Sequence, residues 1–99
     1  MKPIHFHRLA AIELDEAVAH YEEIRSGLGQ ALHEEVIAVA ETIQSFPGIG
    51  AVDKETGYRH LVLKRFPYVL FYHEQVDTLW IVALAHGKRW PAYWLGREV

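Results

Sequence analysis

The residues best suited to chemistry stand close together near the end of the chain, in the stretch HGKRWPAYWLGR from His86 to Arg97. Arginines mixed with large aromatic side chains are the groups that protein interfaces use as energetic anchors. A second interpretation is that Trp90 and Trp94, four residues apart on a short terminal helix, cover the open edge of a core. Both hold if one tryptophan points inward while Arg89 and Arg97 point outward. The pattern predicts a target-binding surface made of Arg89, Trp90, Tyr93, Trp94 and Arg97.

The same residue types also fit a different chemistry, the cleavage of RNA. That reaction needs a group to activate the ribose 2′-hydroxyl, cations to hold the phosphate and an acid for the leaving oxygen. Lys64, Arg65 and Arg89 could hold the phosphate, and Tyr93 could transfer a proton. The net charge of −3 argues against it, because lysines and arginines supply most of the non-specific affinity for RNA. A ribonuclease site is therefore the alternative.

Metal and cofactor sites are not indicated. His5 and His7 share one face of a predicted strand, but a zinc site takes three or four ligands, and the sequence points to no third. The chain has no cysteine, no serine in a nucleophile elbow and no glycine-rich phosphate loop. We expect neither a metal nor a cofactor. Neighbouring acidic residues such as Glu22/Glu23 and Glu34/Glu35 are expected to be solvated charges, since adjacent residues do not face each other on a helix.

The first half of the chain predicts a strand and two helices. Ile4 and Phe6 alternate with histidines, as in a short strand. Apolar residues then recur at spacings of three and four in two stretches, separated by SGLG and ended by Pro47, which predicts an antiparallel helical hairpin with a turn at 27–29. The two stripes are Leu14, Ala17, Val18, Tyr21 and Ile24, and Leu32, Val36, Val39, Ile43 and Phe46.

The second half predicts strands. YRHLVLKRF, YVLFYHE and LWIVALAH are rich in β-branched and aromatic residues, and short connections join them as antiparallel hairpins. The order is then strand, helix, helix, strand, strand, strand. This predicts a single α+β domain over residues 1–99, in two layers, with the helical hairpin on one face of a mostly antiparallel sheet and a short C-terminal helix.

Charge and hydropathy indicate the cellular location of such a domain. Residues 1–57 carry four basic and ten acidic residues, a balance of −6, whereas residues 58–99 carry six basic and three acidic residues, a balance of +3. The longest apolar run, TLWIVALA, is far shorter than the roughly 20 residues that span a bilayer. The first residues show no signal-peptide pattern. We expect a cytoplasmic protein without membrane contact.

Taken together, the short strand, the acidic helical hairpin with GLG, the YRHLVLKRFPYVLFY hairpin and the terminal HGKRWPAYW resemble the RelE/ParE superfamily of toxins from bacterial type II toxin–antitoxin systems. The resemblance runs over essentially the whole chain. Its ParE branch is the closer match, because a strand ending in histidine, then basic residues, proline, one residue and Tyr-Trp is typical of it.

The resemblance implies a toxin that a cognate antitoxin keeps inactive. In ParE relatives the usual target is DNA gyrase, and the toxin traps the intermediate in which gyrase has cleaved the DNA. RelE-like, ribosome-dependent cleavage of messenger RNA is the alternative. Nucleases of that type place more residues between the arginine corresponding to Arg89 and the tyrosine, and usually carry basic residues in the second helix. Here that helix, ALHEEVIAVAETIQ, has none. A third possibility is a partner-binding family member without toxicity.

The partner is expected to lie in a groove between the helical hairpin and the sheet. A high apolar content in a short chain favours apolar surface outside the core, and the resemblance implies an antitoxin tail that folds on binding. A homodimer and a hetero-oligomer with the antitoxin both stay open.

Overall fold

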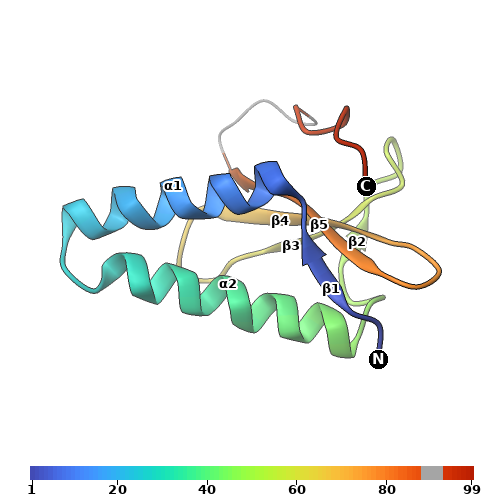
Figure 1. The fold of residues 1–99 in the computed structure, drawn as a ribbon, viewed down its shortest axis with the longest axis horizontal. Coiled ribbons are helices and arrows are strands. Elements are labelled where there is room, and N and C mark those ends of the chain that lie inside the picture. The colour runs from blue at the N-terminus through green and yellow to red at the C-terminus, as the bar shows by residue number, and fades with distance from the viewer. Residues whose placement is uncertain (88–92) are drawn as a thin grey trace.

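The computed structural model describes residues 1–87 and 93–99. Its helices pack side by side on one face of a five-stranded sheet (Figure 1), which confirms the predicted α+β architecture and element order. A two-residue strand, β2, was not predicted. The elements are β1 (Ile4–Phe6), α1 (Arg8–Ile24), α2 (Leu28–Ser45), β2 (Ala51–Val52), β3 (Arg59–Val62), β4 (Tyr68–Glu74) and β5 (Leu79–His86).

The sheet is mostly antiparallel, as predicted, with the strand order β1-β5-β4-β3-β2. Only β1 is parallel to its neighbour, and it pairs with β5 from Leu79 to Ile81 alone. Among the described residues, β5 therefore has a partner strand on both sides at its beginning but an open edge on the β1 side from Val82 onward. This open edge governs how the end of the chain is placed.

The turn between the helices depends on two glycines and one carboxylate. Gly27 has a φ of 88°, in the left-handed region that favours glycine. The carboxylate of Glu22 accepts hydrogen bonds from the backbone N–H groups of Gly27 and Gly29, at 2.8 and 3.0 Å. It thereby satisfies free donors at the start of α2. Glu22 is exposed, as expected of a solvated charge, and the structure adds this capping role, which was not predicted.

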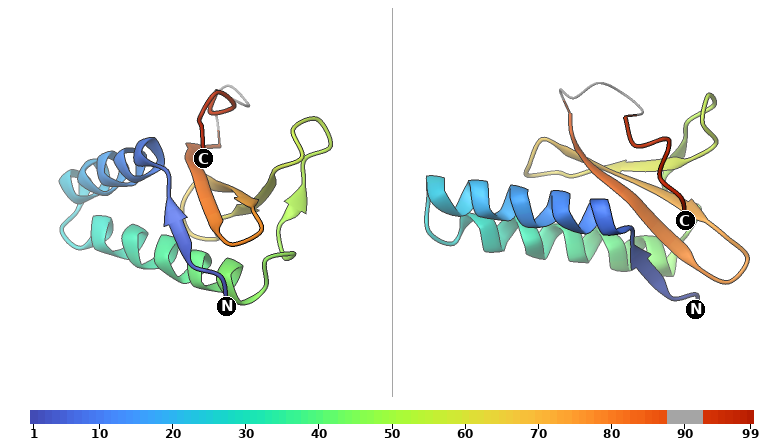
Figure 2. Two further views of the ribbon diagram at one scale, coloured as in Figure 1. Left: turned by 45° about the vertical axis from the view of Figure 1, so that its right-hand side comes forward. Right: turned by 45° about the horizontal axis from the view of Figure 1, so that its top comes forward.

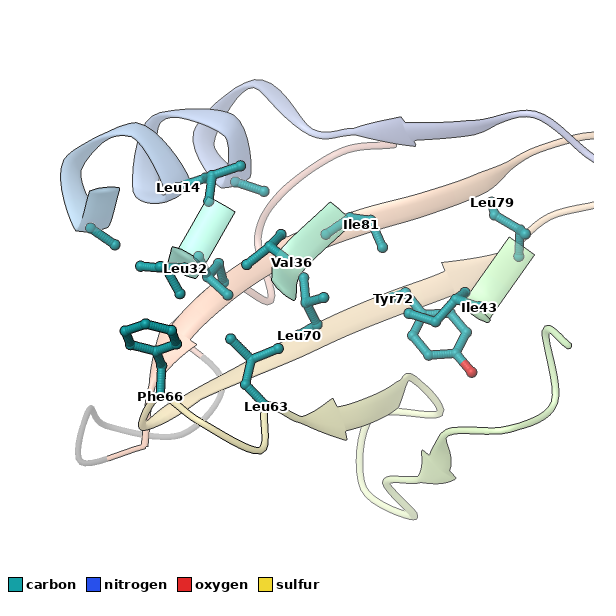
Figure 3. Packing of buried hydrophobic residues seen from close by; sticks show 13 residues of the cluster. Leu14, Leu32, Val36, Ile43, Leu63, Phe66, Leu70, Tyr72, Leu79 and Ile81 are labelled. Atoms are coloured by element: carbon teal, nitrogen blue, oxygen red, sulfur yellow. The ribbon is translucent and has the colours of Figure 1, made fainter. Parts of the chain in front are cut away.

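The main core lies between the helices and the sheet. Figure 3 shows side chains from both helices meeting those of β4 and β5. Tyr72 is also buried here, and its hydroxyl donates to the Pro47 carbonyl (2.7 Å) and accepts from the Gly50 N–H (2.9 Å), which fixes the chain after α2. The larger residues of this core are Leu14, Leu32, Val36, Ile43, Leu63, Phe66, Leu70, Tyr72, Leu79 and Ile81.

A β-bulge in β5 divides its side chains between two cores. Phe71 pairs with Ala83 and Tyr72 with Ile81, so Val82 is the extra residue. Leu79 and Ile81 face the helices, whereas Val82 and Ala83 both belong to a second buried cluster with Trp94. A regular strand would alternate strictly between the two faces. The bulge therefore gives the outer face two adjacent apolar residues.

Residues 93–99, the described part of the chain end, contain no helix, and residues 88–92, where the predicted short helix would begin, lie outside the described residues. Residues 93–96 form a turn, and the Arg97 N–H donates to the Trp94 carbonyl at 3.1 Å. Figure 2 shows this terminal segment, in red, beside β5 and away from α2. Its geometry follows from Trp94, which packs into the outer cluster. Arg89 and Trp90, two of the predicted target-binding residues, lie outside the described residues.

The close approach of the helices predicts an unusual response to alanine at position 29. A Cβ on Gly29 would lie 2.3 Å from the Val18 carbonyl oxygen, so the helices would have to separate. Alanine normally favours a helix, but overpacking of this kind costs about 1–3 kcal/mol. We expect Gly29→Ala to lower the free energy of unfolding by about 2 kcal/mol in urea titrations.

Gly48→Ala is the matched control, because a Cβ there meets no atom within 4 Å. We expect it to change the free energy of unfolding by less than about 1 kcal/mol. Equal stability of the two variants would show that the helices do not approach each other as described.

Candidate functional site

The candidate site lies where the terminal segment closes the open edge of β5. The last contact of β5 with the β1 side is the hydrogen bond from the His7 N–H to the Ile81 carbonyl, 2.8 Å long. Beyond it, the Val82 carbonyl accepts from Arg97 Nη1 at 2.7 Å, and the Leu84 N–H donates to Glu13 Oε1 at 3.1 Å. Two side chains thus satisfy backbone groups that another strand would otherwise have to pair.

Glu13, on α1, is the centre of this arrangement. Besides the Leu84 N–H, its carboxylate accepts the Tyr93 hydroxyl at 2.5 Å and both terminal nitrogens of Arg97, at 2.9 and 2.8 Å. The side chains of Glu13 and Arg97 are only 14% and 11% exposed. The Arg97 guanidinium also lies over the Tyr93 ring, 5.3 Å from its centre. A partly buried, bidentate ion pair of this geometry is strong and directional.

The electrostatics of the pair are consistent with an ionised Glu13. Burial alone would raise the pKa of Glu13, but the hydrogen bonds from Arg97, Tyr93 and Leu84 outweigh it and hold the pKa below its usual value. The hydrogen bond to Glu13 in turn raises the pKa of Arg97. Both directions favour the charged form of each partner.

Trp94 anchors the segment on the outer face of the sheet. It is 2% exposed and packs against Phe71 and Tyr58, with ring centres 4.6 and 4.9 Å apart. Among the two interpretations of the tryptophans, Trp94 thus covers a core. Removing a buried tryptophan costs about 3–5 kcal/mol, so an alanine at position 94 would destabilise the fold and would not act on target binding alone. The predicted outward orientation of Arg97 is wrong, because Glu13 holds it inward.

Of the residues proposed for RNA cleavage, Arg89 lies outside the described residues, and the other three are bound by glutamates of two different helices. The backbone N–H groups of Lys64 and Arg65 donate to Glu35 Oε2 on α2, at 2.8 and 3.3 Å, and both side chains are exposed. The Tyr93 hydroxyl is instead held at Glu13 on α1. Glu35, like Glu22, is not buried, in keeping with the expected solvated charge, but its two backbone hydrogen bonds were not predicted. Glu13 was missed entirely, since nothing in the sequence separates it from the other acidic residues of α1.

A second feature is an open groove of about 360 Å³ between α2 and β3. It lies where the sequence placed a groove between the helical hairpin and the sheet. β2 pairs only with Arg59 and His60, so within the described chain the edge of β3 beyond His60 has no neighbouring strand. The lining is mainly apolar, with one acidic and one basic residue at its rim: Glu35, Ala38, Val39, Thr42, Ile49, Leu61, Val62 and Lys64.

The described residues contain neither a cluster of metal-ligand side chains nor a membrane-spanning helix. Across 1–87 and 93–99, no three histidine, aspartate or glutamate side chains gather as they would around a metal ion. No helix in these ranges is long and apolar enough to cross a membrane.

The lowered pKa of Glu13 predicts a defined pH dependence of stability. A carboxylate whose folded-state pKa lies below its unfolded value stabilises the fold above the unfolded value, about 4.5, and this contribution disappears as pH falls through the folded pKa. We expect Glu13→Gln to lower the free energy of unfolding by about 2 kcal/mol near neutral pH. The difference from the parent chain should shrink below pH ~4.

Urea titrations between pH 3 and pH 7 measure this difference. Glu23→Gln, at an exposed position of the same helix, controls for the loss of one negative charge. A Glu13→Gln difference that stays constant over the whole range would contradict the ion pair described above.

Comparisons with known proteins agree with this fold. The family model for the ParE toxin of the type II toxin–antitoxin system parDE matches residues 4–91. Among solved structures, the chromosomal ParDE toxin–antitoxin system from P. aeruginosa contains a chain that is similar to this one, with a TM-score of 0.75 and 21% identity, over 87% of this chain and 96% of that chain. At that identity the likeness shows a shared fold. A comparison with curated proteins finds no match. Because the family model covers nearly the whole chain, from β1 to the residues before Tyr93, the chain belongs to the ParE toxin family of type II toxin–antitoxin systems.

Proposed function

We propose that the chain is a toxin that inhibits DNA gyrase and that a cognate antitoxin neutralises it. The observation that carries the proposal is the family match over residues 4–91, which includes β5 and the first part of the basic and aromatic segment that follows it, up to Pro91. The target is contacted by this segment, with Arg89, Trp90 and Tyr93 as candidate contact residues. Trp94 and Arg97 act indirectly, because their side chains fix the segment on β5.

The geometry of Tyr93 favours binding over RNA cleavage. A general acid must point its proton at the leaving oxygen of the substrate. The Tyr93 hydroxyl instead donates to Glu13, a carboxylate that Arg97 also binds. In addition, α2 contains no lysine or arginine with which to hold RNA.

Expression in bacteria separates the two activities. We expect the induced chain to stop growth and to raise the DNA-damage response, and Arg89→Ala to lose most of the inhibition, since it removes an interface anchor. Sequencing RNA ends during induction should show no new cleavage within codons. Abundant cleavage that disappears in Tyr93→Phe would replace the gyrase proposal with a ribonuclease. Normal growth with the parent chain would instead indicate a partner-binding protein without toxicity.

The groove between α2 and β3 is proposed as the antitoxin site. Its apolar side chains include Val62 and Ile49, which are 62% and 48% exposed, a large fraction for side chains of this type. The open edge of β3 beside them offers backbone groups to an added segment. Glu35 and Lys64 at the rim offer both signs of charge. An antitoxin tail with alternating apolar residues and charges fits this surface.

Size-exclusion chromatography with the candidate antitoxin tests the site. The two proteins should co-elute, and deletion of the antitoxin tail should abolish the complex. Val62→Asp should weaken binding at least about tenfold, because a charge would enter the apolar groove. Val76→Asp is the control, since Val76 is 94% exposed in the connection between β4 and β5. A complex that survives loss of the tail, or equal affinities for the two variants, would rule this site out.

A further inference from the structure

We infer that Glu13 is the positioning residue for the terminal segment: its carboxylate locks Tyr93 and Arg97 onto the open edge of β5, so that the toxin presents one geometry to its target. The inference rests on the proposed function where it speaks of a target. The locking itself follows from geometry, and it assigns a role in toxicity to a residue of α1 that is remote in sequence from the basic segment.

The side chain of Glu13 connects three separate parts of the chain. Glu13 on α1 binds the backbone of Leu84 on β5, 71 residues away, and the side chains of Tyr93 and Arg97, 80 and 84 residues away. Arg97 then returns to β5 through the Val82 carbonyl. The segment is therefore attached to the strand both directly and through the helix.

Only a carboxylate at position 13 can accept hydrogen bonds from all the donors that surround it. An ionised carboxylate is a pure acceptor with about four lone-pair positions, and here it receives the Leu84 N–H, the Tyr93 hydroxyl and two Arg97 N–H groups. A glutamine of the same shape has one acceptor oxygen and an NH₂ group that would face other donors. Glu13→Gln therefore preserves the volume of the side chain and disrupts its hydrogen bonds to Leu84, Tyr93 and Arg97, which together form the lock on the terminal segment.

The hydrogen bonds of Glu13 and the antitoxin groove involve different helices. Glu13 on α1 fixes the terminal segment, whereas Glu35 on α2 lines the groove beside β3 and binds the backbone at Lys64. β4 separates β5 from β3 in the sheet. Loosening the terminal segment should thus impair target inhibition and leave antitoxin binding intact, a combination that general destabilisation would not produce.

The test compares Glu13→Gln with Glu23→Gln, which changes an exposed residue of the same helix. Hydrogen exchange followed by NMR reports the amides of Leu84 and Arg97, which should exchange at least about tenfold faster in Glu13→Gln, as the segment opens more often. Growth inhibition should need at least about tenfold more of this variant, and its antitoxin affinity should stay within about threefold of the parent chain. Glu23→Gln should match the parent in all three measurements.

A double-mutant cycle measures the interaction between Glu13 and Arg97 directly. Glu13→Gln should change the exchange of Leu84 and the growth inhibition much less in an Arg97→Gln background, because the two residues act as one unit. If Glu13→Gln does not fold, Tyr93→Phe removes a single hydrogen bond of the same cluster and should accelerate exchange at Arg97 by about threefold.

The outcomes separate the inference from the proposed function. Unchanged exchange at Leu84 and Arg97, or parallel losses of inhibition and antitoxin affinity, would overturn the positioning role. If the parent chain fails to inhibit growth while Glu13→Gln still accelerates exchange, the lock stands and the toxin proposal fails.

Discussion

The structure depends on closing the edge of β5 where β1 ends. β5 supplies buried residues to both cores, and from Val82 onward no strand of the described chain lies beside its β1 edge. Unpaired backbone groups on a buried strand are unfavourable, and an exposed edge also invites association with other strands. Glu13 and Arg97 solve both problems by binding the Leu84 N–H and the Val82 carbonyl. The position of the terminal segment follows from this pairing.

The two edges of the sheet are closed in different ways. The β5 edge is closed from within by an ion pair, and the bulge at Val82 prepares an apolar surface on which Trp94 rests. In the described part of the chain, the β3 edge is covered by β2 only at Arg59 and His60, and the groove beside it exposes Val62. One edge therefore suits the presentation of a fixed surface, and the other suits the addition of a partner.

The sequence predicted the elements whose residues form long periodic patterns. The stripes containing Leu14 and Leu32 predict both helices, and three β-rich runs predict β3 to β5. β2 has only two exposed residues and carries no such pattern. The predicted terminal helix is absent from residues 93–99, where Phe71 and Tyr58 hold Trp94 on the outer face, and the spacing of Trp90 and Trp94 contains no information about that packing.

The site was less accessible to sequence reasoning, since its central interactions join residues more than 70 positions apart. Glu13, Glu22 and Glu35 look alike in the sequence, as acidic residues of a helical hairpin, yet each accepts backbone hydrogen bonds from a different element. Arg97 looks like a surface cation because only the fold places it against Glu13. The basic and aromatic segment itself was recognisable, because residue types and their order suffice for that.

The account is tested most directly by purified DNA gyrase, supercoiled plasmid and rising amounts of the purified chain. If the chain is a gyrase toxin, cleaved linear plasmid should accumulate in proportion to the chain once the gyrase is denatured, and prior mixing with the antitoxin should prevent it. Gyrase that supercoils the plasmid normally at every concentration of the chain, without cleaved DNA, would contradict the account.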